Sequence, residues 1–220
     1  MPIPLKQAIK IGAYVMRQKL KGRERYPLVL MLEPLFRCNL ECIGCGKIQK
    51  PNEILNKNLT IAQCLNAAKE CGAPVVSIAG GEPLMHPEIV EIVEGLIKQK
   101  RYIYLCTNAL LLKNFFGKLP ISPFLTLSIH LDGLEDDHDR IVDQKGVFKI
   151  AVESIREAKK MGYRVTSATT FFEGTTIEQA ETFLDFLNPL GIDGVTLSSA
   201  FRYPDAPDQD HFFGRKRTQE

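Results

Sequence analysis

The chain has 220 residues, of which 45% are hydrophobic and 25% charged, a balance typical of a folded globular protein and not of a disordered one. A chain of this length can bury roughly 70% of its unfolded surface, which favours one domain. Six cysteines are too few for a disulfide scaffold, and Lys6 and Lys10 interrupt the apolar run of a signal peptide, so we expect a cytoplasmic protein with reduced thiols.

Positive charge is concentrated at the N-terminus. The net charge is +2, but residues 1–25 contain seven Lys or Arg and only Glu24 as an acid, so this segment carries +6 and the remaining chain −4. Apolar side chains such as Leu5, Ile9 and Met16 alternate with the cations at helical spacing, which predicts a basic amphipathic helix over residues 1–25. Either it rests on anionic lipid as a peripheral contact at the inner face of the membrane, or it caps the base of the fold that follows.

Residues 26–199 alternate short β-branched runs with segments of helical period, the pattern of successive βα units around a parallel sheet. Thr60 with Gln63 and Thr176 with Gln179 are capping boxes that open two of the helices. The first strand is apolar throughout, which favours a strand covered on both faces. The fold class is therefore α/β, with six strands predicted near residues 27–33, 74–79, 101–108, 124–133, 163–172 and 192–199.

The tail at residues 200–220 is rich in proline, aspartate and charge and has no sustained period. We expect a loop or an unfinished connection there.

Three cysteines, Cys38, Cys42 and Cys45, follow the first predicted strand within the stretch FRCNLECIGCGKI. Thiols this close in one loop indicate metal ligation. Zinc would need a fourth ligand, and no Cys or His follows until Cys64 and His86, so zinc is the weaker interpretation. On an iron-sulfur cubane, three thiolates would leave one iron open to a ligand from outside the protein.

This cysteine spacing, together with the GGEP turn after the second strand, resembles the radical S-adenosylmethionine superfamily. The resemblance implies a partial (βα)6 barrel in which Cys38, Cys42 and Cys45 hold a [4Fe-4S] cluster. It also implies that S-adenosyl-L-methionine completes the coordination of the fourth iron. An external one-electron reductant would then drive the cleavage of S-adenosyl-L-methionine to a 5'-deoxyadenosyl radical.

The same resemblance assigns the cofactor-binding residues. Those of the turn would line the methionyl amino group, with the glycines allowing close backbone approach, although a plain Gly-Gly turn is the alternative. Polar residues at the ends of strands three and four would contact the ribose and the carboxylate, or else be satisfied polar groups near a core. One departure is Gly44, because many members carry an aromatic neighbour of the adenine at that position. The predicted set is Gly80, Gly81, Glu82, Pro83, Thr107, Asn108, Ser128 and His130.

Four longer stretches, YPLVLMLEPLFRCNLECIGCGK, GAPVVSIAGGEPL, YLCTNALLL and HLDG, resemble the adenosyl-hopene transferase branch of the superfamily. The resemblance implies a transferase of hopanoid biosynthesis that adds the 5'-deoxyadenosyl radical to the terminal alkene of a hopene such as diploptene, forming adenosylhopane. Members of that branch continue beyond the sixth strand, so the C-terminal segment is expected to be truncated here.

Radical addition to the alkene would leave a tertiary carbon radical that must gain a hydrogen atom. Cys106 is the candidate donor, because a thiol S–H bond is weak and this residue ends strand three, where barrel sites gather. The alternative is a small buried hydrophobic residue that strand alternation turns away from the barrel lumen.

Two other functions compete with the hopene reaction. A radical S-adenosylmethionine enzyme could act on another isoprenoid or a peptide, and a metal-binding module could have no turnover at all. No nucleic-acid partner is expected, since the positive charge is not interleaved with stacking aromatics.

Overall fold

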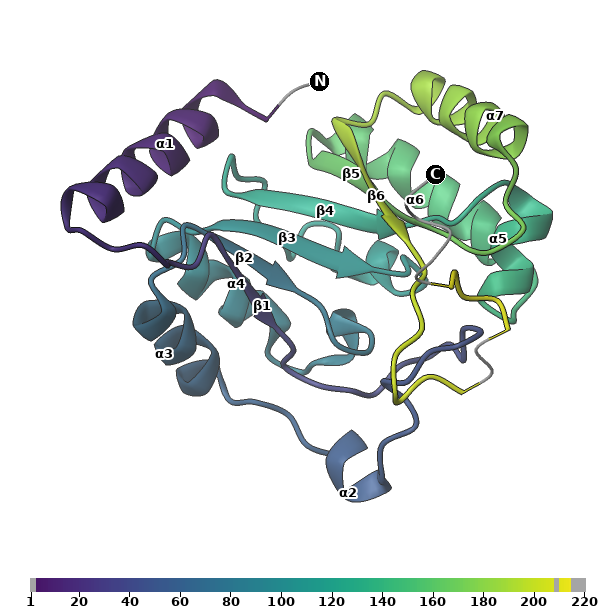
Figure 1. The fold of residues 1–220 in the computed structure, drawn as a ribbon, viewed down its shortest axis with the longest axis horizontal. Helices are drawn as coiled ribbons and strands as arrows, with labels where there is room; N and C mark the ends of the chain where they lie inside the picture. Colours follow the sequence, from purple (N-terminus) through teal and green to yellow (C-terminus); the bar gives the residue numbers. More distant parts are fainter. Residues whose placement is uncertain (1–2, 208–209, 215–220) are drawn as a thin grey trace.

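The computed structural model describes residues 3–207 and 210–214. Its centre is one sheet of six parallel strands in the order β1-β2-β3-β4-β5-β6, each hydrogen-bonded to the next along the chain (Figure 1). The curled, open sheet with helices outside it is a partial (βα)6 barrel, which confirms the predicted fold class. The strands are β1 (Val29–Leu32), β2 (Val75–Ile78), β3 (Tyr102–Thr107), β4 (Leu125–His130), β5 (Arg164–Phe171) and β6 (Gly194–Ser199).

Helices connect successive strands, so every crossover carries the chain over the outer face of the sheet. Both predicted capping boxes form, at Thr60 and Thr176. The helices are α1 (Leu5–Leu20), α2 (Asn52–Leu55), α3 (Ile61–Cys71), α4 (Ile89–Lys98), α5 (Glu135–Ile141), α6 (Val147–Met161) and α7 (Ile177–Leu187), with short 3₁₀ helices at Pro83–Met85, Leu112–Phe115 and Asn188–Leu190.

The two faces of the sheet differ in chemistry. On the outer face, strand residues such as Ile78, Leu105 and Leu127 are fully buried with helix residues in the main core. Strand register places polar side chains on the opposite, inner face, where Cys106 pairs with Ser128. The inner face therefore forms the wall of an open lumen.

The expectation that the first strand is covered on both faces is wrong. Val29 and Met31 are 48% and 60% exposed, because β1 is an edge strand and these two residues share the inner face with Ser77. An apolar run alone does not distinguish a central strand from an edge strand beside an open lumen.

Helix α1 lies at the amino-terminal end of the strands, away from the cysteine loop (Figure 1). Gln7 is buried there and donates a hydrogen bond from Nε2 to Tyr104 Oη, at 3.3 Å. Lys10 donates to the carbonyl of Lys100 and lies over the ring of Tyr102. The helix thus caps the base of the barrel. Within the described residues, no helix has the length and apolar character needed to cross a bilayer.

Candidate active site

The cysteine loop begins where β1 ends and lies at the carboxyl ends of the strands, where barrel active sites form. A turn brings Cys45 N to 3.0 Å from the carbonyl of Cys42, and Ile43 N bonds the carbonyl of Ile141 on α5 at 2.8 Å. Burial raises the pKa of Cys38 to about 11 and that of Cys42 to about 12, with the neighbouring cysteines adding to the shift. Cys38 and Cys42 therefore need a nearby cation to become thiolates at neutral pH.

The donor set suits an iron-sulfur cubane. In the part of the chain that the structure describes, no three His, Cys, Asp or Glu side chains converge as the ligands of one metal ion do. A cubane places each of its thiolates on a different iron, so it does not require such convergence. Three partly buried thiols on one loop fit that arrangement.

The GGEP turn packs against the start of the cysteine loop. Gly81 N bonds the carbonyl of Leu35 at 3.0 Å, and Glu82 N bonds the carbonyl of Arg37 at 2.8 Å. A Cβ at Gly80 would lie 2.2 Å from the Leu35 oxygen, and one at Gly81 would lie 1.9 Å from the Arg37 oxygen. Both positions require glycine because the backbone of the cysteine loop packs directly against the backbone of the turn. The sequence pattern did not reveal this reason.

Glu82 is 1% exposed and joins this turn to the end of β3. Its carboxylate accepts hydrogen bonds from Thr107 Oγ1 and Asn108 N, both at 2.8 Å, and from Leu84 N at 3.0 Å. Burial raises the pKa of this carboxyl group, while the three donors favour its charged form. Glu82 is thus a buried acceptor that fixes two of the predicted cofactor residues, and Pro83 begins the 3₁₀ helix that follows it.

Asn108 connects β3 to the cysteine loop. Its Nδ2 donates to Asn39 Oδ1 at 2.8 Å and lies 3.9 Å from Cys38 Sγ. Hydrogen bonds near a ligating sulfur orient it and tune the cluster it holds. The structure therefore brings Asn108 together with Cys38, whereas Thr107 contacts Glu82.

His130 ends β4 on the inner face, and its Nε2 donates to Asp132 Oδ2 at 2.5 Å. Burial disfavours the imidazolium, but the Asp132 carboxylate outweighs this and raises the pKa of His130. The other Asp132 oxygen accepts from Thr170 N at 2.7 Å. His138 accepts from Asp132 N through Nδ1, and burial lowers its pKa to about 4.

Cys106 and Ser128 are neighbours in the strand register and share the inner wall. Cys106 Sγ lies 3.5 Å from Ser77 Oγ, and burial raises the pKa of this thiol. Strand alternation therefore turns Cys106 toward the lumen. Its position near the carboxyl end of β3 places it on the side of the barrel where the cysteine loop lies.

Gly44 has aromatic neighbours after all, and they come from the tail. The ring of Phe212 lies 2.3 Å from the place a Cβ at Gly44 would take, and the Tyr203 hydroxyl donates to the Gly44 carbonyl at 2.9 Å. A cavity of about 270 Å³ adjoins Gly44 and Cys45 there, and its walls include Phe172, Tyr203 and Phe212.

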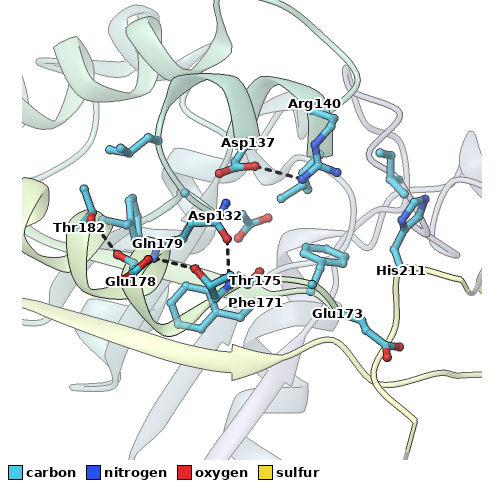
Figure 2. A pocket seen from close by; sticks show the side chains of 18 residues that line it. Asp132, Asp137, Arg140, Phe171, Glu173, Thr175, Glu178, Gln179, Thr182 and His211 are labelled. Atoms are coloured by element: carbon cyan, nitrogen blue, oxygen red, sulfur yellow. Dashed lines mark hydrogen bonds and ion pairs between the residues drawn. The ribbon is translucent and has the colours of Figure 1, made fainter.

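A second cavity, of about 380 Å³, lies between the β4–α5 and β5–α7 connections and reaches the cysteine loop at Ile43 (Figure 2). On the α5 side, Arg140 pairs with Asp137 at 3.2 Å. The acidic residues in its lining are Asp132, Asp137, Glu173 and Glu178.

The model of the Radical SAM superfamily matches residues 32–187. A probable GTP 3',8-cyclase of Methanococcus maripaludis is 27% identical over 174 residues, which cover 77% of this chain and 57% of that protein. The GTP 3',8-cyclase of Petrotoga mobilis is 29% identical over 156 residues, 68% of this chain and 48% of that protein. The chain thus spans about half the length of these curated relatives.

Among solved structures, SuiB of Streptococcus suis bound to its precursor peptide SuiA superposes with a TM-score of 0.69 at 22% identity, covering 89% of this chain and 44% of SuiB. SuiB has also been solved bound to S-adenosylmethionine. At this identity the likeness concerns the fold.

The chain belongs to the radical S-adenosylmethionine superfamily, whose cofactors are a [4Fe-4S] cluster and S-adenosylmethionine. The hopene expectation, by contrast, is contradicted: the curated relatives are named GTP 3',8-cyclase, and neither they nor the structural neighbours connect the chain with adenosyl-hopene transferases or hopanoids. The quoted stretches that suggested that branch lie around the strand ends, where the superfamily's shared motifs are also found.

Sequence reasoning missed several residues of the site. Asn39 and Asp132 lie beside predicted residues but were assigned no role, and neither was His138, which is buried. The position of Asp132 at the carboxyl end of a predicted strand was a usable signal. Tyr203 and Phe212 had none, because only the tertiary fold brings the tail to the loop.

Proposed function

We propose that this chain cleaves S-adenosylmethionine reductively, with Cys38, Cys42 and Cys45 as the cluster ligands. The observation that carries the proposal is the placement of three partly buried cysteines on one loop. The start of that loop is hydrogen-bonded to the GGEP turn, and Cys38 lies beside Asn108. When bound, the cluster supplies the electron that converts S-adenosylmethionine to methionine and a 5'-deoxyadenosyl radical.

Residues around the cysteine loop would hold the nucleoside and amino acid parts of S-adenosylmethionine. The backbone of Gly80 to Pro83 is proposed to receive the methionyl amino group, and Asn108, Ser128 and His130 the carboxylate and ribose. The aromatic cavity beside Cys45 is large enough for a purine ring, and Phe212 and Tyr203 supply the aromatic surfaces that a glycine at position 44 does not. Thr107 is proposed to act through Glu82, since its hydroxyl is already committed to that carboxylate.

The substrate is proposed to be neither a hopene nor a nucleoside triphosphate. GTP appears in the names of the relatives, but four carboxylates line the cavity of about 380 Å³, where Arg140 is the one guanidinium among the described lining residues. Such a lining disfavours a triphosphate, because like charges repel more strongly in a partly enclosed site. A polar substrate without phosphate, such as a peptide, fits this lining better.

Anaerobic reconstitution tests the function. The chain is loaded with iron and sulfide, reduced with dithionite and mixed with S-adenosylmethionine, and 5'-deoxyadenosine is measured by liquid chromatography. The wild type is expected to form it and Cys45→Ala is not, whereas Cys71→Ala, a cysteine on α3 outside the site, serves as the matched control. Stoichiometric zinc with no cleavage product would support the non-catalytic alternative.

We also propose that residues 1–25 form a basic helix whose outward face contacts membrane, residues 26–199 the catalytic barrel and residues 200–220 a tail. Leu5, Ile9, Met16 and Leu20 are 75%, 61%, 60% and 82% exposed. At 3.6 residues per turn they fall within about 60° of arc, nearly opposite the buried Gln7 and Gln18.

Cations flank this exposed apolar stripe, and the segment carries seven Lys or Arg against Glu24, so an anionic lipid surface is the complementary partner. Co-flotation with phosphatidylglycerol vesicles is the test. Ile9→Gln with Met16→Gln should abolish it, while Ile177→Gln, at an apolar residue of α7 that is 78% exposed, should not. Equal flotation of both variants would contradict the membrane contact. So would a double variant that still floats but no longer self-associates, because the stripe would then contact a second copy of the chain. The cytoplasmic location stays a prediction.

A further inference from the structure

The tail crosses over the cysteine loop and is held at both of its ends. We call residues 200–207 and 210–213 the strap. Ala200 N bonds the carbonyl of Phe171, Phe213 N bonds the carbonyl of Ala200, both at 2.8 Å, and Glu173 N bonds the carbonyl of His211 at 2.9 Å. The bonds to Phe171 and from Glu173 join the strap to the end of β5 and the turn after it, and the bond between Phe213 and Ala200 joins the two ends of the strap. In Figure 1 the yellow strap and the dark cysteine loop lie side by side.

One hydroxyl group links the strap to both sides of Cys45. Tyr203 Oη donates to the carbonyl of Gly44 at 2.9 Å and accepts from Gly46 N at 2.6 Å. The two backbone groups belong to the residues immediately before and after the third cysteine. A single side chain therefore satisfies a donor and an acceptor that would otherwise leave this part of the loop free to rearrange.

The loop in turn is shaped to receive the strap. Gly44 has φ +71°, and a Cβ there would lie 2.3 Å from the Phe212 ring. A Cβ at Gly46 would lie 2.6 Å from the carbonyl oxygen of Asp205. Phe212 is 5% exposed and packs edge-on against Tyr203 and Phe172, with ring centroids 5.9 and 6.0 Å away. Both glycines are thus explained by the strap, which the sequence pattern alone did not indicate.

We infer that the strap positions the third cluster ligand, with Tyr203 as a positioning residue for Cys45. The inference rests on the proposed function only in taking Cys45 as a ligand. Its consequence is that the strap governs how long the cluster is retained, since a cubane is lost when one of its few protein ligands moves away.

Tyr203→Phe removes only the hydroxyl, and Tyr163→Phe is its matched control. Tyr163 Oη donates to the carbonyl of Leu119 at 2.7 Å, a buried tyrosine-to-backbone bond remote from the loop. Both variants lose a tyrosine hydroxyl, so both are expected to unfold at lower denaturant. Only Tyr203→Phe is expected to lose the cluster faster to a chelator, by about tenfold, and to alter the electron paramagnetic resonance signal of the reduced cluster.

A second measurement uses the chain without cluster, so that the strap is tested even if no cluster assembles. Amide hydrogen exchange at residues 43–46 should speed up in Tyr203→Phe and keep the wild-type rate in Tyr163→Phe. Gly44→Ala should also lose the cluster quickly, and Gly44→Ala with Phe212→Ala should recover part of the retention because the clash is relieved. Failure of the wild type to load a cluster contradicts the proposed function. Equal cluster loss and equal exchange in the two tyrosine variants overturns the strap's role.

Discussion

Asn108 Nδ2 donates to Asn39 Oδ1 across 2.8 Å and so ties the carboxyl end of β3 to the residue that follows Cys38. The same amide group lies 3.9 Å from the Cys38 sulfur. Through its backbone N–H, Asn108 also bonds Glu82. One residue thereby joins the cysteine loop, the GGEP turn and the sheet.

Asn108→Ala should weaken cluster retention without preventing folding. The substitution removes the hydrogen bond to Asn39, the residue after Cys38, and the N–H donor near the Cys38 sulfur. Outer hydrogen bonds of this kind are worth about tenfold in metal affinity. Iron and sulfide content after gel filtration measures the effect. Asn114→Ala, an exposed asparagine in the 3₁₀ helix Leu112–Phe115, is the control. Equal iron content in the two variants would contradict the role given to Asn108.

Glu82→Gln should lower the free energy of unfolding by about 2–4 kcal/mol. The buried carboxylate accepts three hydrogen bonds. In glutamine, the NH₂ group would replace one of the accepting oxygens and would lie against N–H or O–H donors that it cannot accept from. Urea denaturation of the chain without cluster gives the value. The same change at Glu94, an exposed residue of α4, should cost little, and a Glu82→Gln chain as stable as the wild type would show that this network is dispensable.

How much of this site was predictable depends on the kind of interaction. The six strands follow from local period, and the three cysteines and GGEP turn from short motifs whose spacing is fixed by chemistry. The exposure of Val29 and Met31 was not predictable, because the edge of the sheet is set by which strands pair. The contacts of Tyr203 with Gly44 and Gly46 span 157 to 159 residues and leave no local pattern.

His138 should make the stability of the fold depend on pH. It is buried and its pKa is lowered to about 4, so the unfolded chain, with an ordinary histidine pKa near 6.5, binds more protons between these values. Stability is therefore fully present above about pH 6.5 and falls as the pH drops toward 4, by up to about 3 kcal/mol. Denaturant unfolding of the wild type and of His138→Gln at several pH values measures it. A pH profile that is the same in both would contradict this assignment.

Cys106 is proposed as a hydrogen-atom donor to radicals formed in the lumen. Its thiol exchanges its proton for deuterium in D₂O, so deuterium should appear in the 5'-deoxyadenosine formed without substrate, as measured by mass spectrometry. Cys106→Ala should reduce that labelling, whereas Cys71→Ala should leave it unchanged. Unchanged labelling in Cys106→Ala would remove the donor role and leave Cys106 as a packing residue beside Ser77.

The central claim is that three thiolates hold the cluster and leave one iron for S-adenosylmethionine. Electron paramagnetic resonance of the reduced, reconstituted chain tests it most directly, with and without S-adenosylmethionine. The account predicts a [4Fe-4S] signal that changes when S-adenosylmethionine is added, and no such signal in Cys38→Ala, Cys42→Ala or Cys45→Ala. A cluster signal that ignores S-adenosylmethionine, or that survives the loss of one of these cysteines, would contradict it.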